Sequence, residues 1–165
     1  MYKRQPFIHY GDEIGMARAG SLVGDAGLRT PMSWTADTQR AGFSTGTPFR
    51  ALSGNVATHN VAAQAADPAS LLAQYQGLLA LRRGSPALAR GSTSDVAARG
   101  NLLRWRRDFG DTDQALVAVN TGSMAGTLTH QGLVPGRCFA AVWPVADLTG
   151  WFARAMDRIP VSLAS

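Results

Sequence analysis

Two adjacent carboxylates, Asp12 and Glu13, are the first side chains in this sequence whose types could do acid–base chemistry. Glu13 is the only glutamate among the 165 residues. A pair of carboxylates that serves one substrate bond has to converge on it, whereas neighbouring residues of an extended chain point to opposite sides. We therefore expect no catalytic pair here. Glu13 is expected instead to accept hydrogen bonds from donors at the end of a strand.

Metal-binding residue types are few and scattered. His9, His59 and His130 are far apart, and none has the i, i+4 spacing of a helical metal pair. Cys138 is the only cysteine, so the chain can form neither an internal disulfide nor a C-x-x-C site. Its apolar neighbours predict a buried, inert thiol. The sequence predicts no metal site and implies no cofactor.

The net charge of +5 raises the question of nucleic-acid binding. It arises from fifteen arginines and a single lysine, set against eleven acidic residues. The arginines are dispersed, and only Arg104, Arg106 and Arg107 cluster. In a strand, Arg107 would face away from the other two. There is also no run of about 18 apolar residues. The composition therefore argues against nucleic-acid and membrane partners.

Three elements would position the N-terminal residues. Residues 6–10 are mostly apolar and include β-branched and aromatic types, which predicts a short buried strand. Residues 11–66 are rich in glycine and lack clear periodicity, which predicts a long loop, and loops of this length are usually functional. Residues 68–83 are predicted to form a helix, because Asp67 suits the N-cap and Pro68 the first turn. The apolar positions of this helix recur at helical spacing: Leu71, Leu72, Tyr75, Leu78 and Leu79.

The pattern changes at about residue 91 to a period of two, interrupted by turns. Short strands are expected at 101–109, 115–120, 127–130, 139–143 and 160–163. Strands at this spacing are typical of an antiparallel sandwich, which we expect to span residues 91–165 and to be slightly truncated. Residues 148–158 fit either a helical turn or an irregular insertion.

Residues 6–15 resemble the last barrel strand of glycoside hydrolase family 13, the α-amylase superfamily, whose pattern there is roughly P-x-I-Y-Y-G-x-E-x-G. Three further motifs follow in the family's order at 28–34, 41–44 and 60–64. They resemble the R-T-P-M-Q-W, A-G-F-(S/T) and N-V-x-x-Q of the α-glucosidase, oligo-1,6-glucosidase, trehalose-synthase and related α-amylase branch. Four residues depart from these patterns: His9, Asp12, Ser33 and Phe49. The departures bear on which subfamily the sequence resembles and not on its resemblance to the superfamily.

The resemblance implies that residues 6–90 are the last β/α unit of a (β/α)8 TIM barrel. An all-β antiparallel sandwich would follow as the C-terminal domain. Residues 1–5 have no link to this pattern, and a GTG start followed by the adapter sequence TATAAGAGACAG would encode them. We expect them to be a sequencing scar that replaces the true N-terminus. The sequence therefore does not distinguish a cytoplasmic from a periplasmic enzyme.

The resemblance also implies a retaining enzyme that hydrolyses or transfers α-glucosidic bonds without a cofactor. Its substrate would be an α-glucan, a maltooligosaccharide or a small α-glucoside. In the family, the nucleophile, the acid and a third aspartate come from earlier barrel strands, so no catalytic residue is expected in this chain. Arg29 matches a family arginine that pairs with an early aspartate and binds a hydroxyl at the non-reducing end of the sugar in the −1 pocket. A guanidinium fork can hold both groups, although a purely structural ion pair is the alternative.

Four residues are expected to support the active face of the barrel: Asp12, Glu13, His59 and Asn60. For His59, a hydrogen-bonded loop histidine is the alternative. Trp34 and Phe43 could stack on sugar, but a tryptophan in this position more often anchors a loop. Tyr10 is expected in the core.

Two functions of other classes remain open. One is a free-standing carbohydrate-binding β-sandwich with an N-terminal arm, in which residues 91–165 alone would bind starch or maltose. The other is a basic nucleic-acid module, whose binding would depend strongly on salt concentration.

Overall fold

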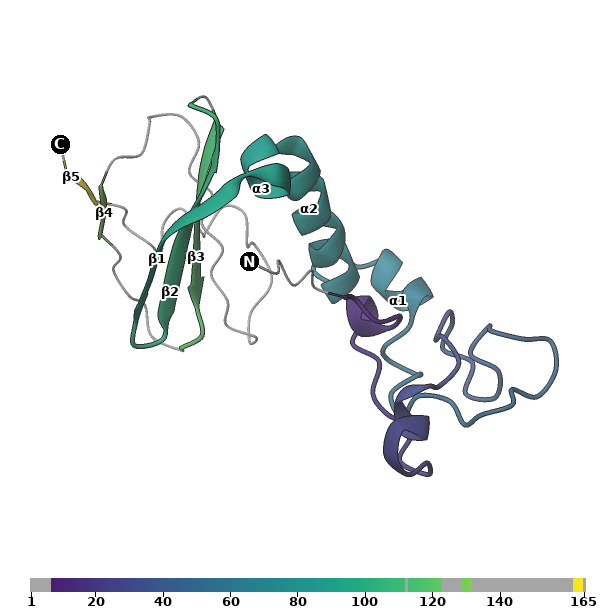
Figure 1. Cartoon of the computed structure of the whole chain (residues 1–165). Coiled ribbons are helices and arrows are strands. Elements are labelled where there is room, and N and C mark those ends of the chain that lie inside the picture. The colour runs from purple at the N-terminus through teal and green to yellow at the C-terminus, as the bar shows by residue number, and fades with distance from the viewer. Residues whose placement is uncertain (1–6, 112, 123–128, 132–161, 165) are drawn as a thin grey trace. The chain divides into compact units, whose positions relative to one another are not determined.

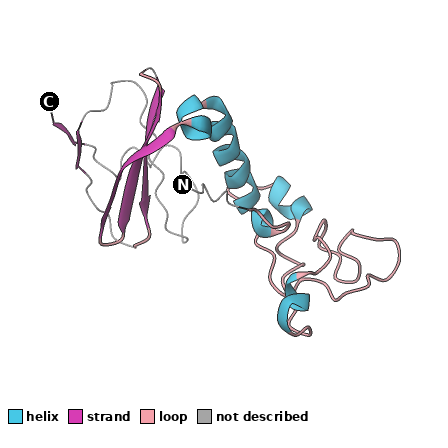
Figure 2. Ribbon diagram, viewed as in Figure 1, coloured by secondary structure: helices cyan, strands magenta, loops and turns pink. Residues whose placement is uncertain are grey.

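The computed structural model describes residues 7–111, 113–122, 129–131 and 162–164. The chain divides into two units, Met1–Gly77 and Leu78–Ser165. Among the described residues, loops and short helices make up most of the first unit, and all of the strands lie in the second (Figures 1 and 2).

Residues 7–10 do not form the strand that the sequence predicts at 6–10. Residues 7–9 have no regular secondary structure, and Phe7 is 96% exposed. A parallel strand takes its backbone hydrogen bonds from neighbouring strands, and no described strand pairs with this segment. Tyr10, expected in the core, is 45% exposed for the same reason.

Three short helices lie within residues 11–66, where the sequence predicts only loop. They are η1 (Asp12–Ile14), η2 (Gly24–Leu28) and α1 (Val61–Ala65). Elements of three to five residues are too short to show helical periodicity. Local backbone geometry determines them instead. For example, η1 is flanked by Gly11 and Gly15, whose φ angles of 90° and 65° are ones that glycine adopts readily.

The main helix α2 (Leu71–Gly84) begins three residues later than the predicted 68–83. Asp67 accepts a hydrogen bond from the backbone N–H of Ala69 at 2.8 Å, within the turn that precedes the helix. Ser70 accepts from the N–H of Ala73 at 3.2 Å and so takes the capping role expected of Asp67.

The leucine face of α2 is not buried by the described residues. No residue of the helix is fully buried, and Leu78 and Leu79 are 37% and 46% exposed. Leu71, Leu72 and Tyr75 are half-buried, so the described residues meet the prediction of a core-facing stripe only in part.

A small core with many polar members holds the first unit together. Ile14 and Ala41 are 0% exposed and Val56 is 7% exposed. Several polar side chains are buried with them: Thr30, Ser33, Ser53, Asn60 and Ser70. Since so little apolar surface is buried, hydrogen bonds carry much of the local structure.

The second unit begins within α2, and a short helix that was not predicted follows, α3 (Pro86–Arg90). Ser85 accepts a hydrogen bond from the N–H of Leu88 at 3.2 Å, and Pro86 occupies the first turn.

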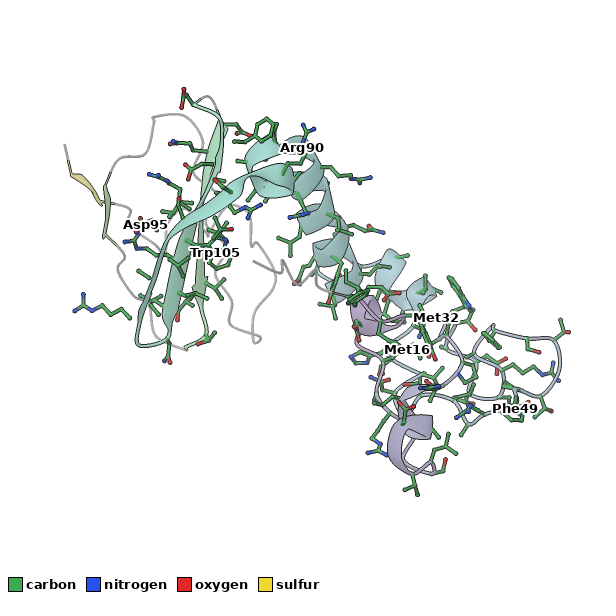
Figure 3. All side chains as sticks on the ribbon, in the orientation of Figure 1. Met16, Met32, Phe49, Arg90, Asp95 and Trp105 are labelled. Carbon is green, nitrogen blue, oxygen red and sulfur yellow. The ribbon has the colours of Figure 1, made fainter. Side chains whose placement is uncertain are left out.

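An antiparallel sheet follows, with strand order β1 (Ser92–Arg99), β2 (Leu102–Phe109), β3 (Asp113–Asn120). The strands predicted at 101–109 and 115–120 are confirmed. Trp105 of β2 pairs with Val117 of β3, and Asp95 lies at an irregularity in the register of β1. Figure 3 labels both side chains on the sheet. Four small or aliphatic residues of the sheet are buried: Leu102, Ala115, Leu116 and Ala118.

The remaining described strands, β4 (Thr129–Gln131) and β5 (Ser162–Ala164), pair in parallel. This corrects the expectation of an entirely antiparallel sandwich. Parallel pairing needs a long connection, and about thirty residues separate these two strands, whereas the prediction assumed successive hairpins. The expected strand at 139–143, residues 148–158 and Cys138 lie outside the described residues.

Candidate functional site

Arg29 is held by an acidic partner from its own loop. Its Nη2 atom lies 2.6 Å from Oδ2 of Asp25, and the two side chains are 63% and 67% exposed. The pair spans η2, and Arg29 itself forms the C-terminal cap, donating its N–H to the carbonyl of Ala26 at 3.2 Å. The sequence analysis looks for the partner on an early barrel strand and misses Asp25. The i, i+4 spacing of opposite charges is the signal that could have found it.

The next residue, Thr30, is tied to the N-terminal segment. The hydroxyl of Tyr10 donates to the carbonyl oxygen of Thr30 at 2.9 Å, across twenty positions. Thr30 is 3% exposed. The contact joins the two sequence motifs that resemble a barrel strand and its following loop.

Asp12 and Glu13 both accept hydrogen bonds from nearby backbone. Oδ2 of Asp12 accepts from the N–H of His9, and Oε2 of Glu13 accepts from the N–H of Gly11, both at 2.9 Å. Each carboxylate thus serves a different backbone donor in one tight turn. The expectation that Glu13 accepts from backbone donors is met, but both residues lie in the helix η1 and not in the extended chain from which their divergence was predicted.

His59 and Asn60 differ in exposure. The ring Nδ1 of His59 lies 2.9 Å from Oγ1 of Thr58, and the residue is exposed. Asn60 is 0% exposed: its side chain caps α1 by accepting from the N–H of Ala63 at 2.9 Å and donates to the carbonyl of Val56 at 3.0 Å. Asn60 therefore supports the loop from inside and does not line a surface.

The sequence analysis missed the residues that brace this region. The side-chain amide of Asn55 donates to the carbonyl of Gly15 at 3.0 Å and accepts from the N–H of Ala17 at 2.9 Å. Ser53 donates to the carbonyl of Ala17 at 2.7 Å. Gln64, part of the N-V-x-x-Q motif, contributes the third polar side chain. Both amide side chains, Asn55 and Gln64, are half-buried, and their occurrence in a long loop was the signal available in the sequence.

Aromatic side chains near these residues remain open to solvent. Trp34, Phe43 and Phe49 are 48%, 53% and 96% exposed, and Figure 3 labels Phe49 on the extended loop of the first unit. Trp34 anchors its loop through its backbone, donating to Ala41 at 2.9 Å and accepting from Ala62 at 3.0 Å. Its ring is left half exposed.

The described residues thus hold an exposed ion pair between Arg29 and Asp25. Nowhere in them do three His, Cys, Asp or Glu side chains gather as a metal site would need. No helix among them is long and apolar enough to cross a bilayer.

Comparison with known families decides the broader assignment. Residues 1–91 match the model of the α-amylase catalytic domain. The chain belongs to the α-amylase family. Curated members of this family agree: the chain is 42% identical over 136 residues to a probable α-glucosidase of Rhizobium meliloti (strain 1021). It is also 33% identical over 153 residues to a trehalose synthase of Thermus thermophilus.

Solved structures of the α-amylase family give the same assignment. The chain resembles the trehalulose synthase MutB of Pseudomonas mesoacidophila MX-45 with a TM-score of 0.57 at 28% identity. The match covers 70% of this chain and 27% of that enzyme. Such neighbours are TIM-barrel enzymes of glycoside hydrolase family 13. The matches cover 73% and 84% of this chain but only 24% and 16% of the two curated relatives.

Proposed function

We propose that the intact enzyme containing this chain cleaves or transfers α-glucosidic bonds with retention at the anomeric carbon. The observation that carries this proposal is the match of residues 1–91 to the α-amylase catalytic domain. Relatives named α-glucosidase, trehalose synthase and glucan 1,6-α-glucosidase support it. This chain would supply the last β/α unit of the barrel and the following β domain.

Retention needs a nucleophilic carboxylate and a carboxylic acid about 5–5.5 Å apart on either side of one bond. We place neither role on Asp12 or Glu13: each accepts from a backbone N–H of its own turn, and the family resemblance puts the catalytic carboxylates on earlier barrel strands. We assign the nucleophile and the acid to parts of the intact enzyme outside this sequence. The chain then contributes substrate recognition rather than bond cleavage.

Arg29 is the proposed recognition residue. Its guanidinium has five N–H donors in a fixed fork, and Asp25 is its side-chain partner among the described residues. Remaining donors can bind a sugar hydroxyl while Asp25 holds the group in place. An aspartate from an earlier strand would complete the contact at the non-reducing end of the sugar in the −1 pocket.

The proposed substrate is a small α-glucoside. One solved relative, a mutant of trehalulose synthase MutB, is described in complex with the substrate sucrose. A charged group that binds the terminal hydroxyl would favour cleavage of the unit at the non-reducing end, since a further glucose on that hydroxyl would remove the contact. Maltooligosaccharides and α-glucans are the longer alternatives.

The test is the anomeric configuration of the first product. The intact enzyme is incubated with maltose, sucrose, trehalose and a soluble α-glucan, and the reaction is followed by proton NMR before mutarotation. The proposal predicts glucose or a glucoside released first in the α configuration, fastest from a disaccharide. Release of the β anomer, or turnover of none of these substrates, would refute it.

The two alternative functions receive less support. A free-standing carbohydrate-binding module would not require the match to a catalytic domain over residues 1–91, which precede β1. The clustered arginines are already engaged: Arg104 contacts Asp95 at 2.5 Å, Arg106 contacts Asp108 at 2.9 Å, and Arg107 donates to Ala87. They offer little free charge for a nucleic acid.

A further inference from the structure

The hydroxyl of Tyr10 makes one described hydrogen bond, and it ends beside Arg29. It donates to the carbonyl oxygen of Thr30 at 2.9 Å. The ring is 45% exposed, so burial alone does not explain why a tyrosine stands here. The hydroxyl contact gives this residue a specific role in the loop.

The backbone around Arg29 is fixed on both sides. On the N-terminal side, its own N–H donates to the carbonyl of Ala26 at 3.2 Å. On the C-terminal side, Pro31 has a locked φ and restricts the residue before it. Between these two constraints, the orientation of the Thr30 peptide group is set by its carbonyl oxygen. The hydroxyl of Tyr10 holds that oxygen through a hydrogen bond.

Tyr10 is itself positioned by the two carboxylates of the first turn. The N–H of Gly11, which follows Tyr10, donates to Glu13 at 2.9 Å, and the N–H of His9, which precedes it, donates to Asp12 at 2.9 Å. The rings of His9 and Tyr10 lie 4.4 Å apart between centroids. The acidic turn therefore holds the backbone on both sides of the tyrosine.

We infer that Tyr10 is a positioning residue for Arg29: its hydroxyl fixes the Thr30 carbonyl and thereby directs the guanidinium toward the sugar hydroxyl. This inference rests on the proposed role of Arg29 in substrate recognition. A merely structural tether would hold the loop equally well, but its loss would lower kcat/KM by the same factor for every substrate. A positioning role acts only on substrates that carry the recognised hydroxyl.

The experiment is a double-mutant cycle in the intact enzyme with Tyr10→Phe, Arg29→Ala and both together, and Tyr75→Phe as control. The hydroxyl of Tyr75, in the helix α2, has no hydrogen bond to the described residues, so its variant removes a hydroxyl without removing this contact. Each variant is assayed on p-nitrophenyl α-glucoside and on its 4-deoxy analogue. The ratio of the two kcat/KM values is independent of how much enzyme is folded.

We expect Tyr10→Phe to lower kcat/KM on the parent glucoside by about tenfold, equivalent to ~1.4 kcal/mol. Its effect on the 4-deoxy analogue should be less than about twofold, and its effect in the Arg29→Ala background equally small. Tyr75→Phe should match the wild type on both substrates.

The outcomes separate this inference from the proposed function. If Arg29→Ala leaves kcat/KM unchanged, the proposed role of Arg29 fails. If Arg29→Ala reduces kcat/KM but Tyr10→Phe acts equally on both substrates, or independently of Arg29, Tyr10 is a structural tether and the inference is overturned.

Discussion

The side-chain amide of Gln64 donates to the carbonyl oxygen of Ile14 at 2.7 Å, joining residues fifty positions apart. The same amide accepts from the backbone N–H of Leu72 at 3.0 Å. One side chain thus connects the first turn of the chain to the start of α2. Ile14 is fully buried and Leu72 is half-buried, so one end of this bridge reaches into the small core of the first unit.

Gln64→Glu should destabilise the first unit. The carboxylate keeps the acceptor for Leu72 but loses the donor to Ile14 and faces a carbonyl oxygen, which we expect to cost about 1–3 kcal/mol. Hydrogen exchange of residues 14–17 should become faster. Gln39→Glu, at an exposed position, is the control and should change nothing. Equal protection in both variants would show that the bridge contributes no stability.

Gly91→Ala should destabilise the second unit. A Cβ atom at this position would overlap the carbonyl oxygen of Ala87 and lie 2.8 Å from that of Asp108. We expect a loss of about 1–3 kcal/mol, measured as a lower melting temperature, since backbone must move to relieve the overlap. Gly84→Ala, where a Cβ meets nothing within 4 Å, is the matched control and should keep or raise the stability. Equal melting temperatures would contradict the predicted crowding.

The purified 165-residue chain should hydrolyse neither p-nitrophenyl α-glucoside nor starch. Its two adjacent carboxylates, Asp12 and Glu13, each accept from a backbone donor of their own turn, and we assign the nucleophile and the acid to earlier strands of the intact enzyme. The assay compares the chain with its Glu13→Gln variant. Turnover that survives purification and disappears in that variant would mean that Glu13 is catalytic.

Parts of the fold were predictable because their signals are local. The strand at 101–109 and the body of the main helix follow from the spacing of apolar residues, and both are present. The helices α1 and α3 were missed because five residues are too few to show a period. The parallel pair β4 and β5 was also missed, because the pairing of strands about thirty residues apart depends on tertiary contacts rather than on local sequence.

The candidate site was predictable in its residue types but not in its contacts. Sequence motifs pointed to Arg29 and to the acidic turn, yet the partner of Arg29 in this chain is Asp25. Tyr10 was assigned to the core because its neighbours are apolar. Its exposure and its bond to Thr30 depend on which elements lie beside the segment, and a single sequence does not specify them.

The central claim is that Arg29 recognises the sugar, and the most direct test is steady-state kinetics of Arg29→Lys and Arg29→Ala in the intact enzyme. Lysine keeps the charge but loses the planar fork. Both variants should lower kcat/KM on short α-glucosides by about a hundredfold or more, which is ~2.7 kcal/mol of transition-state stabilisation. Thermal melts should show that the lysine variant stays folded. A lysine variant with nearly wild-type kcat/KM, or one whose loss is fully explained by unfolding, would instead make Arg29 a structural residue.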